Sequence, residues 1–282
     1  DPLWSRGLGD VYKRQVLVAD DVRHMAYSIL REAQRKEFET TMECDLSLQT
    51  ADGERFRVNV HMQRGQVGMV IRHVIARIPT LEELGLPPVL QRLAFLKGGL
   101  VLTVGSAGSG KTTTLAALLD HRNTHTGGHI LTVEDPIEYL HSHKKSLVTQ
   151  REVGLDTLSY DEALRRAMRE APNVIMIGEI RDRATMQHAL HYAESGHLCV
   201  STLHANNANQ AVQRIVNFFP EDAHRQLLMD LSLNLRAVVA QRLVQGLAGH
   251  LVPATEIMLL TPYVAELIQK LSLIHISEPT RP

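Results

Sequence analysis

The sequence predicts an α/β fold with a second, smaller α+β domain on its N-terminal side. From Gly99 onward, four short apolar runs alternate with helix-prone segments. This alternation is typical of a parallel sheet that is covered by helices on both faces. The first apolar run leads directly into a glycine-rich loop and a helical segment. Before residue 79, one helical pattern precedes three strand-like runs, which indicates a small antiparallel sheet.

The smaller domain is expected over residues 16–78. Residues 20–38 have helical spacing, and the apolar side chains that share one face are Val22, Met25, Ala26, Ile29, Leu30 and Ala33. Strands are expected at 44–49, 55–60 and 68–74, and Asp52-Gly53 between the first two is a signal for a short hairpin. Prolines at 79, 87 and 88 then break the pattern, so residues 79–98 are interpreted as a linker with short helices.

The two ends differ from the rest of the chain because they have no apolar period. Residues 1–15 and 272–282 resemble translated adapter sequence that recurs at the ends of gene fragments. We therefore expect both segments to be non-native scars and the native gene to extend beyond them. Naturally disordered termini are the alternative interpretation.

The larger domain is expected over residues 99–271. Its predicted strands are 100–104, 129–133, 173–177 and 198–202, and its helices follow Gly110, begin near Tyr160, and follow Asp182 and Asn206. Ligands of parallel sheets bind beyond the carboxyl ends of the strands. Each predicted strand is followed by polar residues at that end, so these residues are the candidates for a functional site.

The strongest candidate is the loop after the first strand, which matches the pattern G-x-x-x-x-G-K-[ST]. Backbone N–H groups of such a loop surround phosphate oxygens, and the helix dipole favours their charge. Lys111 is expected to reach the β- and γ-phosphates, and the Thr112 hydroxyl to ligate Mg²⁺. The predicted ligands are therefore a nucleoside triphosphate and Mg²⁺. The cofactor-binding residues are Gly105, Ser106, Ala107, Gly108, Ser109, Gly110, Lys111, Thr112 and Thr113. Ordinary glycine turns are the alternative.

Carboxylates follow the second and third strands. Residues 134–138 (EDPIE) hold three of them, and hydrolysis needs a carboxylate that orients or deprotonates water. A solvated turn is the alternative. Residues 178–182 (GEIRD) end a buried strand in the manner of a Walker B motif, with Glu179 in the metal or water role. The alternative for this segment is a helix start that favours acidic residues.

Histidines flank the fourth strand. His204 follows the strand, where it can contact a γ-phosphate or serve as a structural hydrogen-bond donor; both remain open. His197 precedes the same strand. A strand extends about 3.3 Å per residue, so both histidines cannot contact one phosphate within one subunit. His188 and His191 have helical spacing but lack a carboxylate or cysteine that would complete a metal site, and they are interpreted as surface residues.

The composition limits the location and the partners of the protein. The net charge is −1, so no overall field favours nucleic acid or membrane. Cys44 and Cys199 lie far apart, which favours a reducing compartment and argues against a zinc site. No apolar run reaches the roughly 18 residues of a membrane span. We expect a cytoplasmic protein without direct membrane insertion.

These residues resemble the secretion ATPases of type IV pili and type II secretion. Residues 168–182 (MREAPNVIMIGEIRD) are similar to the signature of that superfamily, with Asn173 where Asp is usual. Within it, the chain resembles the PilT/PilU retraction branch. Three segments look most like PilU: 141–146 (HSHKKS), 150–156 (QREVGLD) and 203–211 (LHANNANQA). The resemblance covers residues 16–271. The chain lacks the four-cysteine motif that is usual in the extension-type branch of the superfamily.

The resemblance implies a RecA-like P-loop ATPase domain joined to a PAS-like N-terminal domain, with ATP between the two. It makes Glu138 the catalytic glutamate, Glu179 the Walker B glutamate, and His197 and His204 the paired His-box residues. Arg181 of the same signature belongs to this catalytic set. Arg55 and Arg57 match the arginines that close over ATP; exposed strand charge is their alternative interpretation. The start of the PAS-like domain and the C-terminal helical region of the family are expected to be missing.

The implied function is a Mg-dependent ATPase that powers type IV pilus retraction, and so twitching motility. The implied assembly is a homo-hexamer at the inner membrane, held there through a pilus platform protein and working with a PilT-like ATPase. One alternative is an accessory ATP-binding subunit that modulates a PilT-like motor. Another is a nucleic-acid motor, which the absence of a net basic charge disfavours; no nucleic-acid partner is therefore expected.

Overall fold

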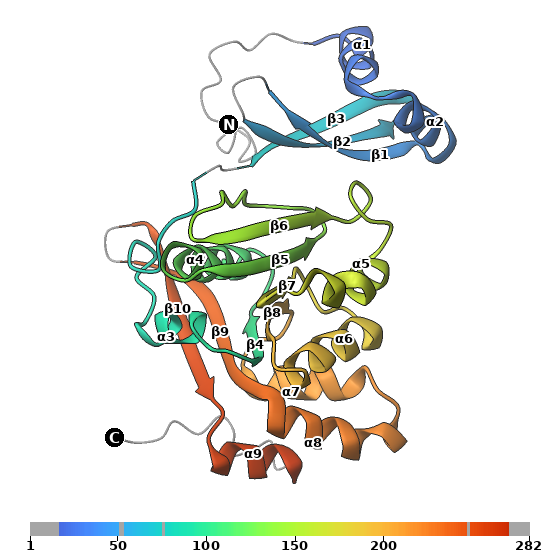
Figure 1. Ribbon diagram of the computed structural model, residues 1–282. Helices are drawn as coiled ribbons and strands as arrows, with labels where there is room; N and C mark the ends of the chain where they lie inside the picture. The colour runs from blue at the N-terminus through green and yellow to red at the C-terminus, as the bar shows by residue number, and fades with distance from the viewer. Residues whose placement is uncertain (1–16, 51–53, 75–76, 247–248, 271–282) are drawn as a thin grey trace. The chain divides into compact units, whose positions relative to one another are not determined.

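The computed structural model describes residues 17–50, 54–74, 77–246 and 249–270 (Figure 1). The chain divides into two compact units, Asp1–Ala76 and Arg77–Pro282. Each unit has its own hydrophobic core. The two expected terminal scars and the predicted Asp52-Gly53 turn lie outside the described residues.

The first unit packs two helices on a three-stranded antiparallel sheet. Its elements are α1 (Ala19–Ile29), α2 (Glu32–Thr41), β1 (Glu43–Gln49), β2 (Arg55–Gln63) and β3 (Gln66–Val74). The strand order β1-β2-β3 confirms the predicted small antiparallel sheet. Alternate residues of β1 and β2 are buried, as a sheet with one covered face requires. They pack with helix residues in a core of Ala26, Leu30, Phe38, Cys44, Leu46, Val58 and Val60.

The single helix predicted over residues 20–38 is wrong. Leu30 has extended backbone angles and ends α1, and α2 begins at Glu32. The guanidinium of Arg35 donates to the carbonyls of Leu30 and Tyr27, at 3.1 and 2.7 Å, and fixes the break. A continuous helix would place Ala26 and Phe38 about 120° apart around its axis. The break allows both side chains to enter one core.

The second unit is built on a seven-stranded sheet with the order β10-β9-β4-β8-β7-β5-β6. All neighbouring strands are parallel except β9 and β10, which are antiparallel. The strands are β4 (Gly99–Val104), β5 (Gly128–Glu134), β6 (Ser146–Glu152), β7 (Val174–Ile177), β8 (Leu198–Leu203), β9 (Leu235–Gln245) and β10 (Leu251–Leu259). The four predicted strands are confirmed as β4, β5, β7 and β8, whereas β6, β9 and β10 were not anticipated.

Helices cover both faces of this sheet (Figure 1). On one face α3 (Val89–Ala94) and α4 (Lys111–His125) pack against Val101, Ile130 and Met176. The other face carries α5 (Tyr160–Ala167), α6 (Arg183–Glu194), α7 (Ala208–Asn217), α8 (His224–Asn234) and α9 (Pro262–Gln269). Short 3₁₀ turns occupy Met168–Glu170 and Glu221–Ala223. The predicted helices after Gly110, near Tyr160, and after Asp182 and Asn206 are confirmed.

The segment predicted as a linker packs onto the larger unit. Leu81, Leu90 and Leu93 are buried in the same core as α4. The Arg122 guanidinium donates to the carbonyls of Ala94 and Leu96, at 2.7 and 2.9 Å. The segment therefore covers part of the sheet face that carries α4.

None of the described helices combines the length and the apolarity that a membrane crossing requires.

Candidate active site

The glycine-rich loop joins the end of β4 to the start of α4. Its glycines are needed where the chain passes close to β9. A Cβ on Gly105 would lie 2.3 Å from the Gln241 carbonyl oxygen, and one on Gly110 would lie 2.7 Å from the Gln241 side-chain nitrogen. Gly110 also has a φ of 85°, which a larger residue adopts only with strain. The loop is therefore specified by contacts as well as by local turn chemistry.

Gln241 supports the loop from beneath. Its amide nitrogen donates to the Ser109 carbonyl at 2.9 Å, and its amide oxygen accepts from the Thr114 hydroxyl at 2.7 Å. The Gln241 side chain is buried and satisfied at both ends. Sequence reasoning missed this residue because no local pattern links a glutamine in β9 to a loop so far away along the chain.

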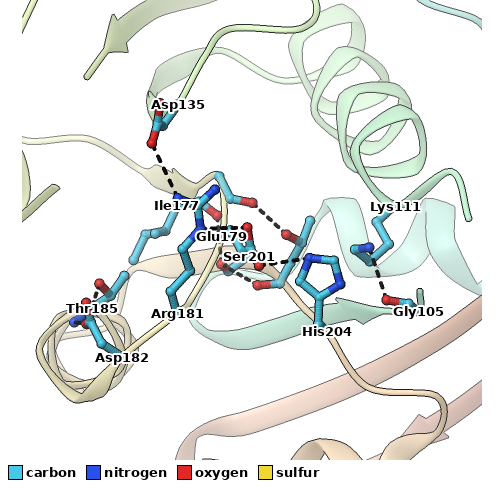
Figure 2. Close-up of polar contacts among 12 residues, drawn as sticks. Gly105, Lys111, Asp135, Ile177, Glu179, Arg181, Asp182, Thr185, Ser201 and His204 are labelled. Carbon is cyan, nitrogen blue, oxygen red and sulfur yellow. Dashed lines mark hydrogen bonds and ion pairs between the residues drawn. The ribbon is translucent and has the colours of Figure 1, made fainter. Parts of the chain in front are cut away.

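Lys111, the first residue of α4, folds its side chain back over the loop. Its ammonium donates to the Gly105 carbonyl at 3.1 Å (Figure 2) and to the Ser106 carbonyl at 2.8 Å. Burial lowers the pKa of Lys111, and the nearby carboxylates of Glu179 and Glu138 act in the opposite direction. The ammonium is thus held at the loop, within the field of both acidic residues that the sequence predicted as catalytic.

The residues of the loop fit a bound phosphate. The Ser109 hydroxyl is buried without a hydrogen-bond partner among the described residues. Gly108 and Gly110 have positive φ angles, and a Cβ on Gly108 would meet no other group within 4 Å. A cavity of about 390 Å³ adjoins the loop, and its polar lining includes Gly105, Ser106, His204, Asn206, Gln210 and Arg214. This volume is within the usual range for small-molecule sites.

Glu179 lies just beyond β7 and is contacted from two sides. Its carboxylate accepts from Arg181 Nε at 2.8 Å, and its other oxygen lies 3.0 Å from His204 Nε2 (Figure 2). Arg181 also reaches Asp135 at 3.4 Å, and its pKa is raised chiefly by the hydrogen bond to Glu179. The ends of β5, β7 and β8 are therefore joined by one polar cluster. Three predicted residues from two motifs meet there: Glu179 and Arg181 of residues 178–182, and His204 after β8.

Glu138 lies in the loop after β5, with an exposed side chain. Its backbone N–H donates to the carboxylate of Glu134, which is buried and has a pKa raised by that burial. The charge of Glu138 contributes to the field at Lys111. In the same loop, the Tyr139 hydroxyl lies 2.9 Å from that of Thr113, next to Thr112 in the first turn of α4. The acidic loop and the phosphate loop are thus neighbours.

His197 does not join this cluster within one chain. It precedes β8, and its ring nitrogen Nδ1 lies 3.0 Å from the Ser195 hydroxyl. His204 follows the same strand, so roughly 20 Å of extended backbone separates the two. Arg55 and Arg57 belong to β2 of the other unit. The functional roles assigned to His197, Arg55 and Arg57 stay predictions.

Asn173 and His188, which the sequence also singles out, both make polar contacts in the larger unit. Asn173, which replaces the usual aspartate of the signature, accepts from the His129 N–H through its side-chain oxygen at 2.8 Å. This contact ties the start of β5 to the segment that leads into β7. His188 pairs with Asp161 at 2.9 Å. No group of three or more His, Cys, Asp or Glu residues in the described parts of the chain is arranged to hold a metal.

A parallel sheet, a lysine-bearing glycine loop and acidic residues at the neighbouring strand ends define the class of P-loop nucleotide hydrolases. The family described as "Type II/IV secretion system protein" matches residues 55–262. The chain belongs to this family, in the branch of PilT and PilU.

Two curated relatives from Pseudomonas aeruginosa are similar over most of the chain. The type IV pilus ATPase PilU is 52% identical over 90% of this chain and 67% of the relative. The type IV pilus retraction ATPase PilT is 44% identical over 88% of this chain and 72% of the relative.

A solved structure of the pilus retraction motor PilT with bound ADP is 41% identical, with a TM-score of 0.89 over 93% of this chain and 76% of that one. The Legionella pneumophila ATPase DotB, at 23% identity and a TM-score of 0.82, shares the fold; it covers 94% of this chain and 77% of that one. The predicted RecA-like domain with its smaller α+β partner is confirmed.

Proposed function

We propose that this chain is a Mg-dependent ATPase subunit of a motor that retracts type IV pili. The observation that carries the proposal is the contact between the acidic loop and the start of α4, where the Tyr139 and Thr113 hydroxyls are 2.9 Å apart, in a chain whose relatives are named as pilus ATPases. Carboxylates that orient or deprotonate water and support a metal ion favour hydrolysis of a bound nucleotide.

Each polar residue has a separate task in this proposal. Lys111 exchanges its two carbonyl acceptors for the β- and γ-phosphates, which are stronger acceptors because they are charged. Glu138 orients or deprotonates the attacking water, and His204 and Arg181 hold the carboxylate of Glu179. Catalysis of phosphoryl transfer depends mainly on such positioning and charge stabilisation.

Mg²⁺ would be held by the Thr112 hydroxyl and by substrate phosphates, with Glu179 beside it. Proteins usually bind Mg²⁺ through one or two side chains together with phosphates and waters, so this sparse set suits the ion. Mg²⁺ would neutralise charge on the phosphates. We expect chelation by EDTA to abolish ATP hydrolysis and added Mg²⁺ to restore it.

The proposed assembly is a homo-hexamer that acts in the cytoplasm, at the inner membrane, through a pilus platform protein. A ring gives His197, Arg55 and Arg57 an opportunity to act at contacts between subunits or units. Hydrolysis would then change the arrangement of the units, and that motion would remove pilin from the base of the pilus.

Lys111→Ala and Glu138→Gln test the enzymatic part of the proposal. Lys111→Ala should lose nucleotide affinity, since the phosphates lose their cationic partner. Glu138→Gln should retain binding and lose turnover by roughly 10²- to 10⁴-fold, the usual contribution of a general base. Steady-state phosphate release and titration with a fluorescent ADP analogue measure the two effects.

Lys97→Ala and Glu194→Gln are matched controls because both residues are exposed and lie outside the cluster. They should behave like the unmodified chain. Full turnover in both Lys111→Ala and Glu138→Gln would refute the ATPase assignment.

An accessory role is the second candidate function. It is favoured by the higher identity to PilU, named only a pilus ATPase, than to PilT, named a retraction ATPase. In that case the chain would bind a PilT-like ring and modulate it. Retraction by cells that lack the PilT-like protein would establish an independent motor; loss of retraction together with capture of the PilT-like ring would establish the accessory role.

A further inference from the structure

The loop that carries Glu138 is held by side chains that lie outside the proposed catalytic set. Residues 135–141 leave the end of β5 and lead toward β6. Beneath them lie Glu134, the last residue of β5, and Gln150 and Glu152 near the end of β6. Gln150 and Glu152 belong to the segment 150–156 that carries part of the family resemblance.

These three side chains bond the backbone of the loop at four places. Gln150 donates to the Tyr139 carbonyl at 2.9 Å and accepts from the His141 N–H at 2.8 Å. Glu152 accepts from the Ile137 N–H at 3.1 Å. Glu134 accepts from the Glu138 N–H. The backbone on both sides of the Glu138 side chain is therefore held by partners from the sheet.

The partners are themselves fixed. Glu134 and Glu152 are directly opposite in the parallel pairing of β5 and β6, and only 4% and 7% of them is exposed. Gln150 also donates to Glu134 at 3.1 Å, and Thr132 does so at 2.6 Å. Two neighbouring buried carboxylates are costly unless hydrogen bonds compensate for the lost water. Here part of that compensation comes from the backbone N–H groups of the loop that carries Glu138.

A separate contact connects the same loop to the nucleotide-binding helix. The Tyr139 and Thr113 hydroxyls are 2.9 Å apart, and Thr113 follows Lys111 and Thr112 in the first turn of α4. The residue after Glu138 is thus bonded to the element that carries the proposed phosphate and metal ligands. The loop has one attachment to the sheet and another to α4.

We propose that Glu134, Gln150 and Glu152 are positioning residues that set the place of the Glu138 carboxylate relative to the phosphate loop, with Tyr139 as the second attachment. The inference rests on the proposed role of Glu138 in hydrolysis. It assigns no chemical step to the three side chains, which act through the backbone of the loop.

Gln150→Met is the main test, because methionine keeps the length of the side chain and removes both bonds to the loop. A displacement of about 1 Å can cost a hundredfold in rate, so we expect kcat to fall about 10- to 100-fold. Affinity for ADP should change less than about twofold, because the position of the Glu138 carboxylate matters in the transition state of hydrolysis and not in nucleotide binding. Tyr139→Phe, which removes one hydroxyl, should lower kcat less.

Arg151→Met is the matched control on the adjacent residue of β6. Arg151 pairs with Glu170 at 3.1 Å and is not bonded to the loop. It should keep both kcat and ADP affinity. An equal fall in kcat for Arg151→Met and Gln150→Met would mean that general damage to β6 causes the loss, and would overturn the proposal.

A double-mutant cycle separates this inference from the proposed function. If Gln150 acts through Glu138, Gln150→Met should cause no further loss of kcat in a Glu138→Gln background. A full additional loss there would refute the positioning role while leaving the ATPase assignment intact. Full turnover by Glu138→Gln alone would instead refute the proposed function. If Gln150→Met does not fold, Tyr139→Phe serves in the same cycle with the same criteria.

Discussion

At the scale of single residues, the contacts of Glu179 serve position more than stability. Arg181 is 55% exposed as a side chain and His204 is 40% exposed, whereas Glu179 is 18% exposed. Ion pairs that are this open to water contribute about 0–1 kcal/mol to the free energy of folding. Their geometry nevertheless joins three strand ends around one carboxylate. We therefore expect loss of a contact in this cluster to lower kcat more than it lowers the free energy of unfolding.

His204→Ala tests this expectation. Removal of the imidazole frees one oxygen of Glu179, and outer partners of metal-site carboxylates typically contribute 10- to 100-fold to activity. We expect kcat to fall by that factor and the free energy of unfolding to change by less than about 1 kcal/mol. His188→Ala removes another histidine–carboxylate pair and should leave kcat unchanged. Normal turnover by His204→Ala would show that His204 is structural.

Residues with a local motif could be identified from the sequence, and residues without one could not. Lys111 and Glu179 were predicted because a strand and a helix start frame them within a few positions. Gln241 supports the same loop from 132 positions beyond Ser109. Gln150 belongs to an edge strand that was not anticipated. Their roles arise from pairing between distant strands, which no spacing rule in one sequence encodes.

At the scale of elements, β9 connects the phosphate loop to the C-terminal part of the sheet. It pairs in parallel with β4 and antiparallel with β10. Gln241 lies within this strand, so the strand that borders β4 also shapes the loop that follows β4. Displacement of β9 along the sheet would therefore move the contacts at Ser109 and Thr114 together.

Gln241→Leu should affect both folding and nucleotide binding. The substitution leaves the Ser109 carbonyl and the Thr114 hydroxyl without their partner, and each unsatisfied buried group costs about 1–3 kcal/mol. We expect a loss of about 2–6 kcal/mol of unfolding free energy for the two groups together, measured by urea denaturation, and weaker ADP binding. Gln245→Leu, in the exposed end of β9, should stay within about 0.5 kcal/mol of the unmodified chain. Equal effects of both substitutions would contradict the role assigned to Gln241.

Prediction of the elements succeeded where one period of apolar residues dominated. The strands β4, β7 and β8 are buried along their whole length, and β5 along most of its length, so they stand out as apolar runs. In β6, only Leu147 and Val148 are apolar, and the last four residues of β9 are exposed. The break between α1 and α2 was missed because the apolar spacing continues across it, while tertiary packing of Leu30 and Phe38 determines where the helix ends.

At the scale of the whole molecule, the chain comprises two units with separate cores. The larger unit contains the phosphate loop and all the strand-end residues that meet in the structure. The smaller unit contains Arg55 and Arg57 on β2. The family resemblance implies that these two arginines contact ATP. Neither arginine belongs to the hydrophobic core of its unit, so this role can be tested without disturbing the core.

The double substitution Arg55→Ala with Arg57→Ala tests whether the smaller unit contributes to the site. Hydrogen bonds to charged groups contribute about 1.5–3 kcal/mol, so loss of even one should weaken ATP binding by roughly tenfold or more. Titration of the full chain with a slowly hydrolysed ATP analogue measures this loss. Arg23→Ala, on α1 of the same unit, should keep the affinity. Unchanged binding by the double variant would support exposed strand charge as the role of both arginines.

The contact between Gln241 and Ser109 also has a consequence for synthesis of the protein. The two residues are 132 positions apart, and ribosomes add about 5–20 residues per second. The phosphate loop therefore leaves the ribosome roughly 7 to 26 seconds before the strand that supports it. Throughout that interval the nascent chain contains the nucleotide-binding motif without its support. The loop therefore gains its hydrogen bonds at Ser109 and Thr114 only after synthesis has passed β9.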